Sequence, residues 1–305
     1  GVPTTRPRVV LRPATTEQVQ AAMRWCHAEG LQVIPQGGLT GLTGAAAPHD
    51  LENTAILSLA RMSKIRELDV EGATLSVDAG AVLGDIRAAA DAAEMYFPLF
   101  HGAVGSSQIG GNLSTNSGGN NALRYGTARD QVLGIEVVLP DGTLWDGMRA
   151  LRKNTAGYDL RQMFIGAEGT LGVITAAVMK LVPAPRAHAT AVLAARSLPD
   201  ALVLLNQLRE ATGGLVEAFE LMPASYMRRL SEARPDVSLP FGGKRYDTNI
   251  LVEIAATAPR DTTADAAGDV PLTSLLQDTL AALMETGAIL DAEIAQTEAQ
   301  RRFVA

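Results

Sequence analysis

Residues 97–126 form the stretch whose residue types and spacing best suit chemistry on a ligand. Seven of these residues are glycine, and small hydroxyl and amide side chains stand between them. Glycine lets a ligand lie against bare main chain, while hydroxyls and amides supply hydrogen bonds without bulk. Apolar anchors (Phe97, Leu99, Ile109 and Leu113) are spaced through the stretch, whereas a flexible linker has few of them. The pattern predicts a site that holds a large polar cofactor, with a solvated loop as the alternative.

A second glycine-rich turn covers residues 36–44 and follows a short predicted strand over residues 31–35. The backbone N–H groups of such a turn form a concave nest that suits a phosphate. A P-loop is disfavoured because no lysine lies between Gly37 and Asp50, and the turn runs into residues 45–48 rather than into the helix that a dinucleotide-binding fingerprint requires. A strand-to-strand turn without a ligand stays open as the alternative.

Helices and strands must position these turns. Thr15 and Gln18 form a predicted capping box, and Val19, Ala22, Met23 and Cys26 follow at helical spacing, which indicates a helix that ends at Gly30. Further along, strands are predicted over 56–59, 68–70, 74–79, 134–139 and 144–145, with one more ending near Val182, and helices over 83–93 and 158–161.

The pattern of predicted strands and helices changes after Pro183 and Pro185. Strands are predicted over 189–194, 215–221, 250–255 and 288–292, and helices over 199–211, 223–232 and 272–285. Alternating elements of this length suggest an α+β layer with helices on one face of a sheet. The sequence ends at residues 301–305 inside a stretch that reads as a helix.

Composition bounds the class of protein. The 305 residues are 47% hydrophobic, which suffices for two domains with real cores. No apolar run approaches the roughly 18–20 residues that span a bilayer, and residues 1–8 lack the apolar core of a signal peptide. We therefore expect no transmembrane segment and a cytoplasmic protein, with peripheral association with a membrane left open.

Charge and cysteine content exclude further classes. The net charge is −7 with charges mixed along the chain, so nothing resembles a nucleic-acid-binding stripe. Cys26 is the only cysteine, and its place in an apolar helical stripe predicts a buried thiol and no internal disulfide. The four histidines, His27, His49, His101 and His188, show no metal-ligand spacing, although His101 adjoins the glycine-rich stretch.

Five ordered motifs carry a family resemblance: PQGGLTGL at 35–42, GSSQIGGNLSTNSGG at 105–119, RYGTARDQVLGIEVVLPDG at 124–142, KNTAGYDLRQMFIG at 153–166 and GAEGTLGVIT at 166–175. Together they resemble the FAD-linked oxidase superfamily of the vanillyl-alcohol oxidase type. Within it, the chain is most similar to the D-2-hydroxy-acid dehydrogenases, the group with D-2-hydroxyglutarate dehydrogenase, D-lactate dehydrogenase and the glycolate oxidase flavin subunit.

The resemblance implies an α+β fold in which a two-subdomain FAD-binding domain (residues 1–186) precedes a substrate or cap domain (187–305) that is truncated at its C-terminal end. It also implies a set of cofactor contacts in the two turns, at Pro98 and in the last motif. These are Gln36, Gly37, Gly38, Leu39, Thr40, Gly41, Leu42, Pro98, Gly105, Ser106, Gly110, Gly111, Asn112, Thr115, Asn116, Gly118, Gly119, Glu168, Gly169, Gly172, Val173 and Ile174. Some members of the family attach flavin through a histidine in the first turn. Because Leu39 and Thr40 stand there, we expect non-covalent FAD.

The implied activity is oxidation of a D-2-hydroxy acid to the 2-oxo acid by hydride transfer to flavin N5, with a base taking the hydroxyl proton. Electrons would pass to a quinone, a cytochrome or an electron-transfer flavoprotein, and a homodimer is possible. The family's metal-binding, base-carrying segment is absent from this sequence, so no catalytic residue is assigned, and a divalent metal is expected only if the chain continues beyond Ala305. Two alternatives stay open: a flavin-binding subunit or fragment that is inactive alone, and an aryl-alcohol or sugar oxidase.

Overall fold

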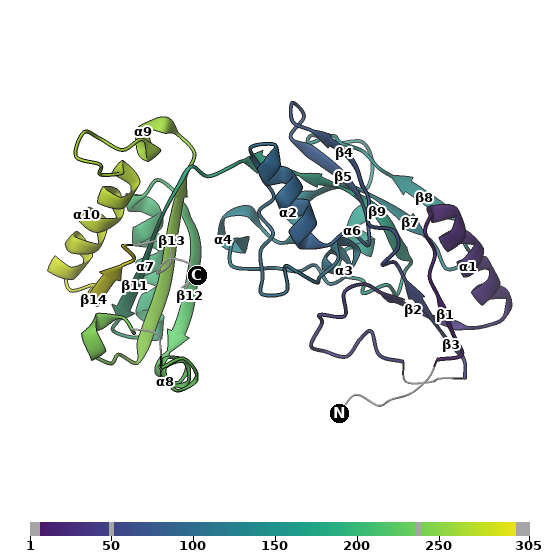
Figure 1. Ribbon diagram of the computed structural model, residues 1–305, viewed down its shortest axis with the longest axis horizontal. Helices are drawn as coiled ribbons and strands as arrows, with labels where there is room; N and C mark the ends of the chain where they lie inside the picture. The colour runs from purple at the N-terminus through teal and green to yellow at the C-terminus, as the bar shows by residue number, and fades with distance from the viewer. Residues whose placement is uncertain (1–6, 49–51, 236–238, 297–305) are drawn as a thin grey trace. The chain divides into compact units, whose positions relative to one another are not determined.

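The computed structural model describes residues 7–48, 52–235 and 239–296 (Figure 1). They divide into two compact units, one within Gly1–Gly119 and Gly126–Pro183 and the other within Asn120–Tyr125 and Ala184–Ala305. Helices and strands mix in both units, which confirms the α+β class. The predicted helix at residues 301–305 lies outside the described residues.

A small parallel sheet opens the first unit. Its strands are β1 (Val9–Leu11), β3 (Thr54–Ser58) and β2 (Gln32–Gln36), in that spatial order. Helix α1 (Thr16–Ala28) connects β1 to β2 and buries Val19, Met23 and Cys26. Thr15 caps its start as predicted, because Thr15 Oγ1 accepts a hydrogen bond from Gln18 N. The second half of the predicted capping box differs, since the Gln18 side chain accepts a hydrogen bond from Ala14 N, one residue before the N-cap.

A larger antiparallel sheet forms the rest of the first unit, in the order β4-β5-β9-β7-β8. The strands are β4 (Ile65–Asp69), β5 (Thr74–Asp78), β7 (Val132–Val138), β8 (Leu144–Gly147) and β9 (Val173–Lys180). Helices and a short ribbon surround it: α2 (Leu83–Ala92), α3 (Ile109–Ser114), α5 (Ala128–Gln131), α6 (Arg161–Phe164), β6 (Met95–Tyr96) and β10 (Val182–Pro183).

One predicted helix lies later in the chain than expected. The short helix assigned to residues 158–161 begins only at Arg161. The Asp159 carboxylate accepts hydrogen bonds from the side chains of Arg161 and Gln162, so it is engaged just before the helix starts, as a turn residue rather than a helical one. The other predicted elements exist within a few residues of their expected bounds.

The second unit is a four-stranded antiparallel sheet in the order β12-β13-β11-β14. The strands are β11 (Ala187–Ala195), β12 (Val216–Pro223), β13 (Thr248–Ala256) and β14 (Ile289–Ile294). Helices α7 (Leu198–Ala211) and α10 (Pro271–Glu285) cover one face (Figure 1) and share an apolar core with it. The shorter elements are α4 (Ala122–Tyr125), α8 (Ala224–Ala233), η1 (Phe241–Gly243) and α9 (Pro259–Thr262).

Helix α4 groups with the second unit although the chain on both sides of it belongs to the first. Its side chains explain this, since Arg124 donates a hydrogen bond to Ala255 O at 2.7 Å and Tyr125 OH donates one to Glu217 at 2.5 Å. The segment is therefore fixed to strands β13 and β12 by polar contacts.

The structure also bears on the expected lack of a transmembrane segment and on the expected burial of Cys26. Among the described residues, no helix is long and apolar enough to cross a membrane. Cys26 is a free, buried cysteine, and burial raises the pKa of its thiol, which keeps the thiol protonated and unreactive at neutral pH.

Candidate functional site

The first glycine-rich turn leaves the carboxyl end of β2, which is where parallel sheets bind their ligands. The Gln36 side chain donates a hydrogen bond to Ala46 O at 2.8 Å and so ties the turn across its base. Leu39 has a φ of 56°, in the left-handed region, and the side chains of Leu39 and Leu42 are 64% and 101% exposed. Residues 39–44 thus stand out from the sheet with exposed main chain.

The second glycine-rich stretch packs directly against this turn. A Cβ on Gly38 would lie 1.9 Å from Ser106 O and 2.9 Å from Ser107 Cα, and one on Gly37 would lie 3.4 Å from Gln108 Oε1. Only glycine at position 38 lets the two main chains come this close. Two segments far apart in sequence, whose contacting residues Gly38 and Ser106 are separated by 68 positions, therefore form one continuous surface, which we call the glycine cradle (residues 36–42 and 105–111).

Local contacts fix the second half of the cradle. Leu83 N donates to Ser107 O at 2.9 Å, and Ile109 N donates to Ala81 O at 3.0 Å, so residues 107–109 are tied to the start of α2. Gly110 packs against Ala79, where a Cβ would meet the Ala79 Cβ at 2.7 Å. The role that the structure gives Gly110 is thus close packing of α3 on the end of β5.

Several predicted contact residues after Gly111 are engaged within the protein. Asn112 is buried, and its amide contacts Ser107 Oγ and Ser117 Oγ. Asn116 has a φ of 49°, and its side-chain oxygen accepts hydrogen bonds from Thr127 Oγ1 and Arg129 N. Thr115 Oγ1 donates to Gly111 O. These side chains hold the shape of the loop.

Gly119 and Gly118 differ in their surroundings. A Cβ on Gly119 would lie 1.8 Å from Phe100 O, whereas one on Gly118 would first meet Thr127 Cγ2, at 4.0 Å. Pro98, two positions before Phe100 in the sequence, is buried. Packing against Phe100 therefore requires glycine at position 119, whereas position 118 has room for a side chain.

The last motif reaches the same place from a third direction. Glu168 N donates to Ser114 O at 2.9 Å, at the end of α3, and a Cβ on Gly169 would lie 3.0 Å from Pro35 Cγ in β2. Glu168 and Gly169 have φ values of 52° and 80°. The C-terminal part of the motif is instead buried at the start of β9 and belongs to the core of the sheet. It comprises Gly172, Val173 and Ile174.

Polar atoms without partners mark the cradle as a ligand site. Within the described part of the chain, the main-chain N–H groups of residues 38–44 donate no hydrogen bond. Gln108 Oε1 and His101 Nε2 are buried and have no hydrogen-bond partner. A Cβ on Gly41, Gly105 or Gly111 would meet no atom within 4 Å. Free N–H donors on an exposed glycine-rich turn suit the phosphates of a dinucleotide, so these residues fit FAD.

Comparison with known proteins agrees with this geometry. Residues 7–147 match the FAD binding domain family. The chain is 39% identical over 252 residues to the mitochondrial D-2-hydroxyglutarate dehydrogenase of Bos taurus, covering 83% of this chain and 45% of the relative. It is 34% identical over 271 residues to a D-2-hydroxyglutarate–pyruvate transhydrogenase of Saccharomyces cerevisiae, covering 89% of this chain and 53% of the relative. It therefore spans about half the length of these relatives.

A solved structure supports the fold. The crystal structure of p-cresol methylhydroxylase with substrate bound superposes with a TM-score of 0.72 at 16% identity, over 96% of this chain and 60% of that one. The fold is thus that of this flavoprotein, and the glycine cradle fits an FAD-binding domain. Residues 7–147 match the FAD binding domain family, and the chain is similar to part of the D-2-hydroxyglutarate dehydrogenases. The predicted resemblance and the predicted cofactor, FAD, are confirmed.

Sequence reasoning missed one cluster of titratable side chains, which lies in the second unit. His188, Glu217 and Glu253 have ligand atoms within 4.8 Å of one another. Their spacing along the chain gave no sign of this, because they come from three different strands. The available signal was Glu253 itself, a single charge within the otherwise apolar run of residues 250–256.

Proposed function

We propose that this chain forms the FAD-binding part of a dehydrogenase that oxidises a D-2-hydroxy acid, of the D-2-hydroxyglutarate or D-lactate type, to the 2-oxo acid. The observation that carries the proposal is the glycine cradle, in which Gly38 packs on Ser106 and leaves a turn of free N–H donors. The substrate class comes from the relatives, whose names specify D-2-hydroxyglutarate.

The chain's own residues bind and orient the cofactor in this proposal. The N–H groups of residues 38–42 would bind the pyrophosphate, while residues 105–119 and the turn at Glu168 and Gly169 would lie along the rest of the cofactor. When bound, FAD supplies the hydride acceptor, its N5 atom. Leu39 and Thr40 offer no side chain for a covalent bond to flavin, so binding is non-covalent and acid precipitation of the protein should release all FAD.

The experiment is the visible absorption spectrum of the purified chain with FAD, recorded before and after anaerobic addition of D-2-hydroxyglutarate or D-lactate. We expect bound flavin that bleaches with one D-acid and not with its L-enantiomer, because the active site must distinguish the two configurations at C2. Flavin that stays oxidised with both D-acids would contradict the activity of this chain. That result would favour the alternative, a flavin-binding part that is inactive alone. Failure to bind FAD would contradict the whole proposal.

Partners and location belong to the same proposal. The electron acceptor would be a quinone, a cytochrome or an electron-transfer flavoprotein, and the chain would act alone or as a homodimer without nucleic acid. The bovine relative is named as a mitochondrial protein, so relatives do not support the cytoplasmic location that we expected, and it stays a prediction. Stopped-flow reoxidation of the substrate-reduced flavin by each acceptor would identify the acceptor.

A further inference from the structure

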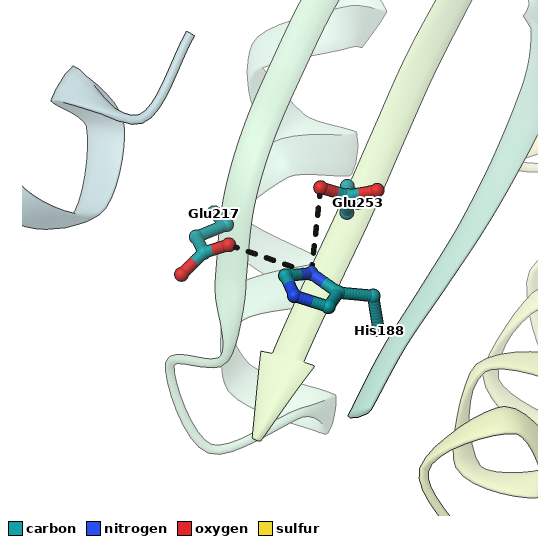
Figure 2. A group of neighbouring side chains, drawn as sticks. All are labelled: His188, Glu217 and Glu253. Carbon is teal, nitrogen blue, oxygen red and sulfur yellow. Dashed lines mark ion pairs between the residues drawn. The ribbon is translucent and has the colours of Figure 1, made fainter. Parts of the chain in front are cut away.

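Three side chains on neighbouring strands of the second unit point toward one another (Figure 2). His188 lies on β11, Glu253 on β13 and Glu217 on β12. The Nδ1 atom of His188 is 3.6 Å from Glu253 Oε1 and 3.8 Å from Glu217 Oε2. Both distances exceed the length of a hydrogen bond. The imidazole and the two carboxylates are thus close together without a hydrogen bond at His188 Nδ1.

Strand register explains why these residues share one face. Thr190 pairs with Glu253, and His188 pairs with Ala255 two residues away on the same face of the sheet. Glu217 sits at a β-bulge between Val216, which pairs with Ile254, and Ala218, which pairs with Glu253. A bulge re-aims a side chain, and here it brings the carboxylate of Glu217 next to the other two residues.

Hydrogen bonds hold one oxygen of each carboxylate away from His188. Glu217 Oε1 accepts a hydrogen bond from Tyr125 OH at 2.5 Å and lies 3.5 Å from Arg124 Nη1. Glu253 Oε2 accepts one from Thr190 Oγ1 at 2.5 Å. The other two oxygens, Glu217 Oε2 and Glu253 Oε1, face the imidazole. Outer hydrogen bonds that orient ligating carboxylates in this way are a regular feature of metal sites.

Burying two carboxylates without a cation costs free energy. The side chains of Glu217 and Glu253 are only 1% and 9% exposed. Arg124 Nη1 lies 3.5 Å from the outer oxygen of Glu217, and the imidazole of His188 lies within 4 Å of both carboxylates. Buried charges are stable only when they are paired or coordinate a metal. In addition, His188 Nδ1 is buried and has no hydrogen-bond partner.

We infer that His188 Nδ1, Glu217 Oε2 and Glu253 Oε1 bind one divalent transition-metal ion, zinc or manganese. Imidazole and carboxylate ligands suit these ions, and ligands about 2.1 Å from a tetrahedral metal lie about 3.4 Å apart, close to the two distances observed. Three protein ligands leave a fourth position for water. This site does not depend on the proposed function.

The test is isothermal titration of the chelator-treated full chain with Zn²⁺ alone and with Mn²⁺ alone. The chain should bind one equivalent of at least one ion. His188→Asn and Glu253→Gln should each weaken binding at least about tenfold. His27→Asn is the matched control, because His27 is an exposed histidine of α1, and it should leave the affinity unchanged.

Two results would overturn the inference: no binding of either ion to the full chain, or equal loss of affinity in His27→Asn and His188→Asn. If circular dichroism shows that His188→Asn is unfolded, Tyr125→Phe provides the decisive variant. It keeps all three ligands and removes the hydrogen bond to Glu217 Oε1, so affinity should fall about 10- to 100-fold. Unchanged affinity in that variant would likewise contradict the site.

Discussion

Gly38 is the residue on which the geometry of the cradle most directly depends. A Cβ at this position would lie 1.9 Å from Ser106 O, and that oxygen belongs to main chain, which no rotamer change can move aside. Gly41, in the same turn, has no atom within 4 Å of the corresponding point. Neither glycine has a positive φ, so the two positions differ in the space available and not in backbone strain.

We therefore predict that Gly38→Ala weakens FAD binding at least about tenfold, or about 1.4 kcal/mol, because the two halves of the cradle must separate. Gly41→Ala is the matched control and should bind FAD within about twofold of the parent. Flavin fluorescence titration measures both affinities, and thermal unfolding shows that each variant is folded. Equal affinities in the two variants would show that the close approach of residues 38 and 106 does not matter for FAD.

Among the elements, α1 carries the connection between β1 and the strand that ends at the cradle. Thr15 caps its first turn by accepting a hydrogen bond from Gln18 N at 3.3 Å. We predict that Thr15→Ala lowers the free energy of unfolding by about 1 kcal/mol. Ser63→Ala, which changes an exposed serine outside any helix or strand, should leave it unchanged. Urea unfolding checks both variants, and an unaffected Thr15→Ala would mean that tertiary packing alone fixes the start of α1.

In the second unit, Asp291 of β14 holds the segment after η1. Its Oδ2 accepts hydrogen bonds from Lys244 Nζ at 3.0 Å and Tyr246 OH at 2.9 Å. Burial by itself raises the pKa of the Asp291 carboxyl, but the hydrogen bonds from Lys244 and Tyr246 outweigh it and lower the pKa below its ordinary value. The carboxylate therefore stabilises the fold above the pKa of an unfolded aspartate, about 3.9, and this stabilisation is lost as the pH falls through the lower folded pKa.

The corresponding prediction concerns Asp291→Asn. Its urea midpoint should fall below that of the parent at pH 7, and the difference should shrink toward zero as the pH falls below about 4. Asp278→Asn, on the exposed side of α10, is the control and should match the parent at both pH values. A deficit in Asp291→Asn that is the same at pH 7 and pH 3 would show that lost packing, and not the charge, is responsible.

At the scale of the whole molecule, the first unit and the second each have a separate apolar core. All cradle residues belong to the first unit. A ligand that binds only the folded state stabilises it by about 2.7 kcal/mol at 100 times its Kd, which corresponds to roughly 5–10 °C for a domain of this size. Calorimetry should therefore show two transitions, of which FAD raises one. A single transition that shifts as a whole would mean that the two units unfold together.

Much of the fold could be predicted because its signals are local. The cap at Thr15, the helical spacing of Val19, Met23 and Cys26, and the hairpin over 68–79 all depend on residues a few positions apart. The predicted start of the short helix, residue 158, lies three residues before the observed start at Arg161, because Asp159 accepts hydrogen bonds from the first side chains of the helix, Arg161 and Gln162. The individual contacts to FAD stay predictions, and the structure separates glycines with open space at the Cβ position, such as Gly41 and Gly111, from those used in packing, such as Gly110 and Gly119.

By itself, the sequence determined which turns are rich in glycine and which strands and helices lead to them, since these follow from backbone preferences and short-range periodicity. Only the tertiary structure decided that Gly38 meets Ser106 and that Gly169 meets Pro35, because such contacts depend on how distant strands align. The same reason applies to His188, Glu217 and Glu253. Their meeting is set by the register of three strands and one bulge, which no spacing along the chain encodes.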